Sequence, residues 1–150
     1  MKHGIPIKCF VIVFFMFTVL AGEAFSETKI NLNIKTILGS EKPGKIDPAL
    51  KGFVKQHKSL FRYSSYSLLS QDSLKLSKKG AGKVSLPGKR VLKITSTGVS
   101  KNRATLDLEI FKNKKLIFQS VIQLRNNSSI TIGGPKYKDG DLLFNIFASF

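Results

Sequence analysis

The sequence predicts a mostly β protein, a single antiparallel β-sandwich of about eight strands with one N-terminal amphipathic helix. Segments in which apolar and polar residues alternate recur along residues 27–150, and Gly, Pro, Asn and Asp lie between them. Only residues 47–61 carry apolar side chains at helical spacing. No segment repeats at a fixed period or has the composition of a linker. These observations together predict one domain, residues 27–150.

The first 26 residues are expected to be a cleaved signal peptide. A basic start that includes Lys8 precedes an unbroken apolar run, residues 9–20, and Ala24 and Ser26 supply the small residues of a cleavage site. The apolar run is about a dozen residues, whereas a membrane-spanning helix needs roughly 20. The sequence therefore predicts export through the secretory pathway, to the periplasm or the extracellular space.

The charge balance is strongly basic. The chain has 25 Lys and Arg against 9 Asp and Glu, for a net charge of +16. Removing the signal peptide takes away Lys2, Lys8 and Glu23, which leaves +15, and also Cys9, the only cysteine. Residues 27–150 therefore offer no disulfide and no thiolate nucleophile or metal ligand. A lysine-rich exported chain without cysteine favours a bacterial envelope protein.

The helix is expected to begin at Asp47 and Pro48. Asp is a favourable N-cap, and Pro suits the first helical position because it has no N–H to leave unpaired. The spacing of the apolar face predicts about three turns. That face would consist of Leu50, Phe53, Val54, His57, Leu60 and Phe61.

The strands are expected to be short, mostly four to eight residues. The segments are 28–40, 62–69, 73–76, 83–86, 90–95, 104–111, 116–124, 129–132 and 142–150. A break at Gly133-Gly134-Pro135 is expected before the last strand. One face of that strand is wholly apolar and is expected to fill the core: Leu142, Phe144, Ile146, Ala148 and Phe150. Leu143 and Phe147, on its other face, form a candidate partner surface.

A set of local motifs resembles a group of small bacterial secreted proteins without an assigned activity. The motifs are Asp47-Pro48-Ala49-Leu50, Phe61-x-Tyr63-x-x-Tyr66-x-Leu68-Leu69, Leu86-Pro87-Gly88, Gly133-Gly134-Pro135 and Asp139-Gly140 before a terminal apolar strand. They consist of caps, turns and aromatic strand positions. The resemblance therefore implies a shared structure and no catalytic residue.

Catalytic groups are scarce. His57 is the only histidine in residues 27–150, and its ring is expected to pack at the border of the helix's apolar face. Asp107 and Glu109 are the one close carboxylate pair on a strand, and we expect them to pair with lysines of neighbouring strands. A small hydrolase that uses this pair is the remote alternative. The sequence has no phosphate-binding loop, dinucleotide fingerprint or nucleophile elbow. We therefore expect a protein that is not an enzyme, with no cofactor and no metal.

Basic residues gather near three turns, which indicates a binding site for a polyanion. Candidate ligands are anionic polysaccharide, lipopolysaccharide and lipid head groups, and an ordinary solvated lysine-rich surface is the alternative. Nucleic acid is disfavoured because export removes the protein from the cytoplasm. Tyr63 and Tyr66 could stack on sugars or bases. The candidate polyanion-binding residues are Lys75, Lys78, Lys79, Lys83, Lys89, Arg90, Lys112, Lys114 and Lys115.

Two alternatives to polyanion binding remain at the level of sequence. The first is a structural or accessory subunit of an envelope or secretion assembly, whose last strand would pair with the edge of an envelope protein partner. The second is a small outer-membrane β-barrel, because a terminal Phe preceded by alternating apolar residues is typical of such a barrel's last strand. The expected strands are shorter than the roughly 9–11 residues that a spanning strand needs.

Overall fold

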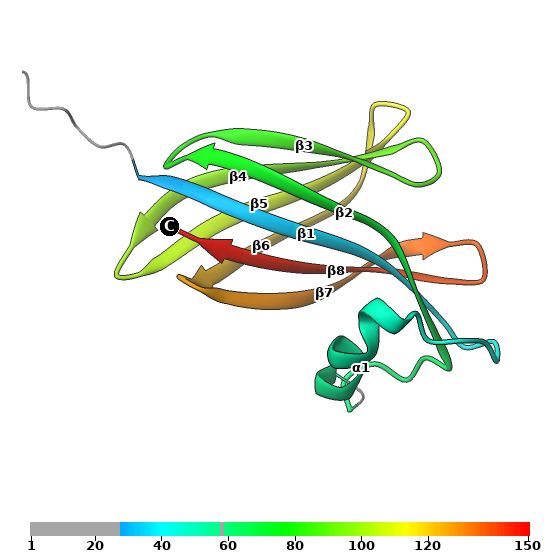
Figure 1. Ribbon diagram of the computed structural model, residues 1–150. Helices are drawn as coiled ribbons and strands as arrows, with labels where there is room; N and C mark the ends of the chain where they lie inside the picture. The colour runs from blue at the N-terminus through cyan, green and yellow to red at the C-terminus, as the bar shows by residue number, and fades with distance from the viewer. Residues whose placement is uncertain (1–27, 58) are drawn as a thin grey trace, which may run out of the picture.

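A computed structural model describes residues 28–57 and 59–150, so the expected signal peptide lies outside the described residues. The chain there forms eight strands and one short α-helix (Figure 1). The bounds are β1 Lys29–Ser40, a 3₁₀ turn Pro48–Leu50, α1 Lys51–His57, β2 Ser65–Ser77, β3 Ala81–Leu86, β4 Arg90–Ser100, β5 Arg103–Lys112, β6 Lys115–Arg125, β7 Ser128–Tyr137 and β8 Gly140–Ser149. The prediction of a mostly β, antiparallel protein is confirmed.

The strands form two antiparallel sheets that face each other across one core. Sheet A has the order β2-β1-β8-β7, and sheet B has the order β3-β4-β5-β6. Alternation along each strand sends one set of side chains inward, so that Ile30, Leu32 and Ile34 of β1 meet the inner face of sheet B. That face carries Leu92, Ile94, Leu106, Leu108 and Ile110, all of them essentially inaccessible to solvent.

The last strand, β8, lies inside sheet A and not at its margin. It pairs with β1 on one side and with β7 on the other, so both of its backbone edges are occupied. The expectation that it pairs with the edge of a partner is therefore wrong. Its predicted inner face is buried as expected at Leu142, Phe144, Ile146 and Ala148, and Phe150 packs against the same core.

Several strands are longer than the sequence predicted. β2 runs unbroken over 13 residues, and Gly133-Gly134-Pro135 lies inside β7. The register passes from Gly133 opposite Leu143 to Lys136 opposite Asp141, which makes the Gly-Gly-Pro segment a bulge and not a break. A Cβ on Gly134 would collide with the ring of Phe144, so glycine allows the bulge to lie flat against the core.

The helix is shorter than predicted. Asp47 caps it as expected, because its Oδ1 accepts a hydrogen bond of 2.9 Å from the N–H of Ala49. The α-helix ends at His57, whose carbonyl accepts the N–H groups of both Leu60 and Phe61 as the chain turns toward β2. Leu60 is consequently 70% exposed and does not belong to an apolar helix face, which corrects the expectation of three turns.

A second, smaller apolar cluster lies on the outer face of sheet A, beneath the helix. Its buried members are Ile37, Leu50, Tyr66 and Leu143, and Phe53 of α1 packs against them. Leu143 is fully buried. The expectation that it forms part of a partner surface is therefore wrong. The reason is that α1 covers this end of the sheet (Figure 1).

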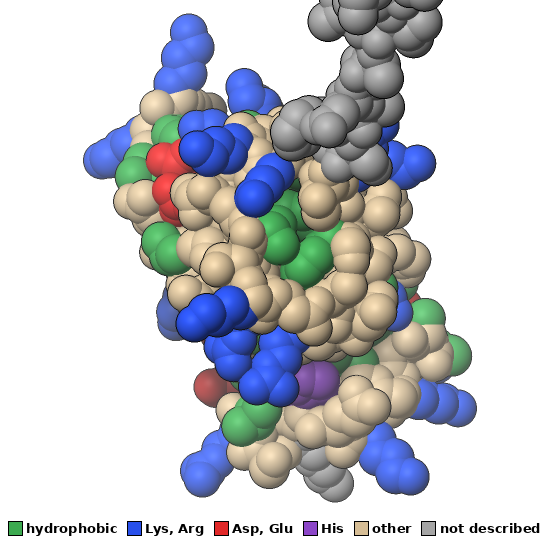
Figure 2. Space-filling model, turned by 90° about the vertical axis from the view of Figure 1, so that its left-hand side faces the viewer, with side chains coloured by type: hydrophobic (Ala, Val, Ile, Leu, Met, Phe, Trp, Pro, Cys, Tyr) green, Lys and Arg blue, Asp and Glu red, His purple; other side chains and the backbone are tan. Residues whose placement is uncertain are grey.

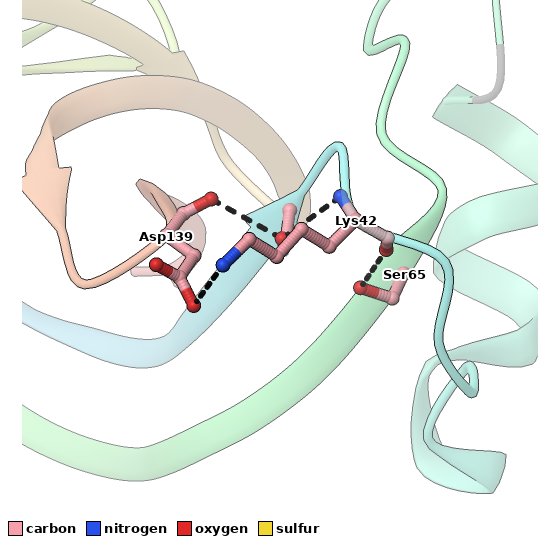
Figure 3. Close-up of polar contacts among 4 residues, drawn as sticks. Lys42, Ser65 and Asp139 are labelled. Carbon is pink, nitrogen blue, oxygen red and sulfur yellow. Dashed lines mark hydrogen bonds and ion pairs between the residues drawn. The ribbon is translucent and has the colours of Figure 1, made fainter.

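The start of the loop after β1 is joined to two other segments by polar contacts (Figure 3). Lys42 forms an ion pair of 2.9 Å with Asp139 of the β7–β8 turn, and its carbonyl accepts a hydrogen bond from Ser65. Ser40 donates to the carbonyl of Asp139. Both ends of the ion pair are mostly exposed, so it contributes little to stability, and the hydrogen bonds define the position of the loop.

Candidate functional site

The nine candidate polyanion-binding residues fall into two groups, one on sheet B and one where the chain passes from sheet A to sheet B. One group lies around the β3–β4 and β5–β6 turns and consists of Lys83, Lys89, Arg90, Lys112, Lys114 and Lys115. The other group, Lys75, Lys78 and Lys79, lies at the β2–β3 turn.

Antiparallel register is what brings the first group together. Arg90 is directly opposite Lys112, and Lys112 is directly opposite Lys115, so three cationic residues occupy one row across three strands. In the next strand pair, Lys83 is opposite Lys93. Like charges that face each other across strands are destabilising. A bound multivalent anion would relieve this repulsion.

A groove of about 450 Å³ lies on the outer face of sheet B and is lined by three residues of the first group, Lys83, Lys89 and Lys114. Arg90, Lys112 and Lys115 do not line it. Its apolar floor consists of Val91 and Phe111, which are directly opposite each other on β4 and β5. Polar and basic side chains complete it, and we call the whole set the basic groove: Lys83, Lys89, Val91, Lys93, Phe111, Asn113 and Lys114.

Two lysines of the basic groove occupy backbone conformations that are uncommon for long side chains. Lys89 has a φ of 56° and Lys114 a φ of 66°. Lys114 and Asn113, whose φ is 50°, form a two-residue hairpin turn that requires positive φ at both positions. Gly or Asn would adopt these conformations at a lower cost. Lys101 and Lys138, which do not line the groove, have positive φ as well, so this conformation is a feature of the turns and not of the groove alone.

The carboxylate pair on β5 does not line the groove, but one of its members contacts a lysine that does. Glu109 forms an ion pair of 2.9 Å with Lys93, as expected from cross-strand pairing. Asp107 has no lysine partner and accepts hydrogen bonds from the side-chain amide of Gln119. Glu109 therefore balances part of the charge of Lys93, whereas within residues 28–57 and 59–150 no ion pair involves Lys83, Lys89 or Lys114.

Arg90 has a different role from the neighbouring lysines. Its guanidinium Nη2 donates a hydrogen bond of 2.8 Å to the carbonyl of Lys136, and the group lies 5.5 Å from the ring centroid of Tyr137. These contacts join sheet B to β7 of sheet A. Arg90 is thus only partly exposed, and its side chain stabilises the packing of the two sheets at this end.

The second group of lysines does not border a groove of this kind. Lys75, Lys78 and Lys79 are all exposed. Figure 2, which views the side that is on the left in Figure 1, shows Lys and Arg side chains over much of the surface with few Asp and Glu side chains among them. Of the nine residues that the sequence suggested, three therefore line one groove together: Lys83, Lys89 and Lys114.

Tyr63 and Tyr66 point into the protein and are not free to stack on a ligand. Tyr66 is almost fully buried and donates a hydrogen bond to the carbonyl of Phe61. Tyr63 donates one of 2.9 Å to Oδ2 of Asp141. Burial, followed by this bond to a carboxylate, raises the pKa of Tyr63 to about 12, and burial raises the pKa of Tyr66.

His57 packs by its ring, as the sequence predicted. The ring is stacked on Phe53 with a centroid separation of 4.5 Å. Its Nδ1 lies 2.9 Å from the carbonyl of Phe53, and its Nε2 lies 3.2 Å from Oγ1 of Thr131. Asn145 donates a further hydrogen bond of 2.9 Å to that hydroxyl. The network fastens the end of α1 to β7 and β8.

Sequence reasoning did not identify Lys93, Val91 or Phe111 as site residues. The available signal was the alternation within residues 90–95 and 104–111, which directs these three side chains to the same face as Glu109. What alternation does not supply is the partner strand. The floor of the groove exists only because β4 and β5 pair in one particular register.

In residues 28–57 and 59–150 no helix is both long and apolar enough to cross a membrane. The same residues contain no group of three or more His, Cys, Asp or Glu side chains placed to hold a metal ion. No family model, no curated protein and no solved structure matches this chain.

Proposed function

We propose that this protein is an exported, non-catalytic binding protein that recognises an anionic component of the cell envelope through the basic groove. The expected ligand carries several phosphates, sulfates or carboxylates beside an apolar portion. Lysine ammonium groups would contact the charges, and Val91 and Phe111 would contact the apolar portion. Phosphorylated or acidic glycolipids and lipid head groups have this combination.

The observation that carries the proposal is the convergence of lysines from separate turns around an apolar floor. Lys83 comes from a strand, Lys89 from the β3–β4 turn and Lys114 from the β5–β6 turn. A surface that merely keeps a protein soluble has no need of such convergence around an apolar floor. The net charge of +16 adds a long-range attraction for any polyanion.

Retention on immobilised heparin tests the proposal, since heparin is a soluble polyanion with no fixed shape requirement. The variant Lys83→Gln, Lys89→Gln, Lys114→Gln is compared with a control that loses the same charge, Lys45→Gln, Lys51→Gln, Lys55→Gln. The control residues are exposed and lie in or near the helix, away from the groove. We expect the groove variant to elute at clearly lower salt than the control.

The salt dependence of heparin affinity gives a second measure of the number of charges that contact heparin. The slope of log affinity against log salt reflects the number of ion contacts. In the groove variant alone, this slope should decrease by the equivalent of about two to three ion contacts. Equal elution of the two triple variants would mean that heparin senses only net charge, and the proposal would then fail. A wild type that elutes with a neutral protein of the same size would also contradict it.

One observation favours a second function, as an accessory subunit of an assembly. β6 is the outer strand of sheet B, and Leu116, Ile117 and Val121 on it are all substantially exposed. A partner strand added to this edge would cover them. Cross-linking from a cysteine introduced at Val121 should then capture one defined partner in the native envelope, and its absence would argue against this alternative.

A further inference from the structure

Where α1 does not cover it, the outer face of sheet A consists mainly of uncharged polar side chains. Its side chains come from alternate positions of all four strands and are mostly amides and hydroxyls. We call this surface the amide face. It includes Asn31, Asn33, Gln71, Ser73, Ser129 and Asn145.

Phe147 stands in the middle of the amide face. It lies on β8 opposite Asn33 of β1 and Ser129 of β7, and it is 40% exposed. A groove of about 280 Å³ runs on one side of it and a groove of about 340 Å³ on the other. Phe147 and Asn33 line both grooves, so the two grooves meet at one aromatic side chain.

The amide face is held rigidly at its helix side. The carbonyl of Phe53 can only accept, so Nδ1 of His57 carries the hydrogen of that bond, and Nε2 forms a hydrogen bond of 3.2 Å with the hydroxyl of Thr131. That hydroxyl in turn accepts from the side-chain amide of Asn145. The rotamer of Asn145 is thereby defined before any ligand arrives, which lowers the entropic cost of binding.

The charges of the amide face are few and of one sign. Lys35 lines one groove and Lys75 the other, and neither groove is lined by a carboxylate. A polyanion site would need more cations, as the basic groove has. A protein interface centre would be richer in large apolar side chains than one Phe. Neutral groups that both donate and accept hydrogen bonds match a ligand rich in hydroxyls.

We propose that the amide face binds a polysaccharide, with one pyranose ring packed on Phe147 and neighbouring sugars in the two grooves. The C–H face of a pyranose is apolar and loses contact with water against an aromatic ring. Its hydroxyls point outward in the ring plane, toward groups in the positions of Asn33 and Asn145. Lys35 and Lys75 extend the range of ligands to glycans with occasional carboxylates.

Titration with three hexasaccharides, followed by amide chemical shifts in NMR, tests this inference. The probes are cellohexaose, chitohexaose and a hyaluronan hexasaccharide, which share the β-linked pyranose backbone and differ in amide and carboxylate content. We expect at least one probe to shift resonances of β1 and β8. The variant Phe147→Ala should weaken that binding by about tenfold or more, as loss of a central aromatic contact does.

The matched control is Val121→Ala, which truncates an apolar side chain of sheet B that is even more exposed than Phe147, at 64% against 40%. It should leave the affinity within about twofold, since no contact is lost. Circular dichroism of both variants should equal that of the wild type, because both side chains are exposed. Binding that disappears in Val121→Ala as well would overturn the inference.

Three further results would overturn it. They are the absence of binding with all three probes, shifts that map to the basic groove, and self-association in which Phe147→Ala dissociates an oligomer without changing glycan affinity. Conversely, glycan binding that persists in the Lys83, Lys89 and Lys114 variant supports a site separate from the basic groove. The two proposals can thus fail independently of each other.

Discussion

Leu143→Ala is the substitution that most directly tests the architecture around the helix. By sequence, Leu143 and Phe147 occupy equivalent positions on the outward face of one strand. In the structure Leu143 is fully buried in a cluster with Ile37, Leu50 and Tyr66, whereas Phe147 is 40% exposed. The two truncations should therefore have very different effects on the free energy of unfolding.

The magnitude follows from burial. Truncation of a fully buried leucine to alanine costs about 2–5 kcal/mol, because transfer energy is lost and a cavity remains. The cluster under α1 is small and the helix can shift to close part of the cavity, so we expect a value near 3 kcal/mol. For a domain of this length that corresponds to a fall of roughly 10 °C in Tm. Phe147→Ala should change the free energy of unfolding by less than about 1 kcal/mol.

Urea denaturation followed by far-ultraviolet circular dichroism measures both values. The m-value should stay constant, which would show that the difference lies in stability and not in the extent of unfolding. If Leu143→Ala loses less than about 1 kcal/mol, or if Phe147→Ala loses more than Leu143→Ala, then α1 does not cover this end of sheet A in solution.

Four other substitutions test separate features of the protein. Gly140→Ala should lose about 2 kcal/mol or more in urea denaturation because its Cβ would overlap the backbone of β1, whereas Gly52→Ala, in open space on α1, should gain up to about 1 kcal/mol. Tyr63 has a pKa raised to about 12 from an ordinary value near 10, so its neutral form stabilises the fold fully below pH 10, and that contribution is lost as the pH rises toward 12. Tyr63→Phe should therefore flatten the alkaline loss of stability, and an unchanged pH profile would contradict the assignment. Lys83→Glu places an opposite charge across from Lys93 and should stabilise by about 0.2–1 kcal/mol while lowering heparin retention, and lowered stability would refute the repulsion argument.

Local patterns were reliable wherever the nearest neighbours in sequence decide the outcome. Period-two alternation identified the inner face of β8, and the Asp47-Pro48 pair identified the helix start. The same reasoning failed at Gly133-Gly134-Pro135, which it interpreted as a break. The bulge there depends on contact with Phe144, which lies ten residues away along the chain from Gly134 and directly beside it in space.

The candidate sites show the same division. Which residues are basic, and that they gather near turns, could be read from the sequence. Which of them converge depended on strand pairing, since Lys75 and Lys83 are close in sequence yet belong to different sheets. Likewise the amides of β1 and the single aromatic Phe147 are separated by more than a hundred residues, and only the pairing of β1 with β8 makes them neighbours.

By itself, the sequence determined the strand-rich class, the apolar face of the last strand and the strongly basic charge. These depend on side-chain chemistry and on the period of the backbone, both of which are local. Only the tertiary structure decided the order of strands, the burial of Leu143 beneath α1, the floor of the basic groove and the position of Phe147 among the amides. Each of these requires two segments to meet, and register between distant strands is a property of the whole packed sheet.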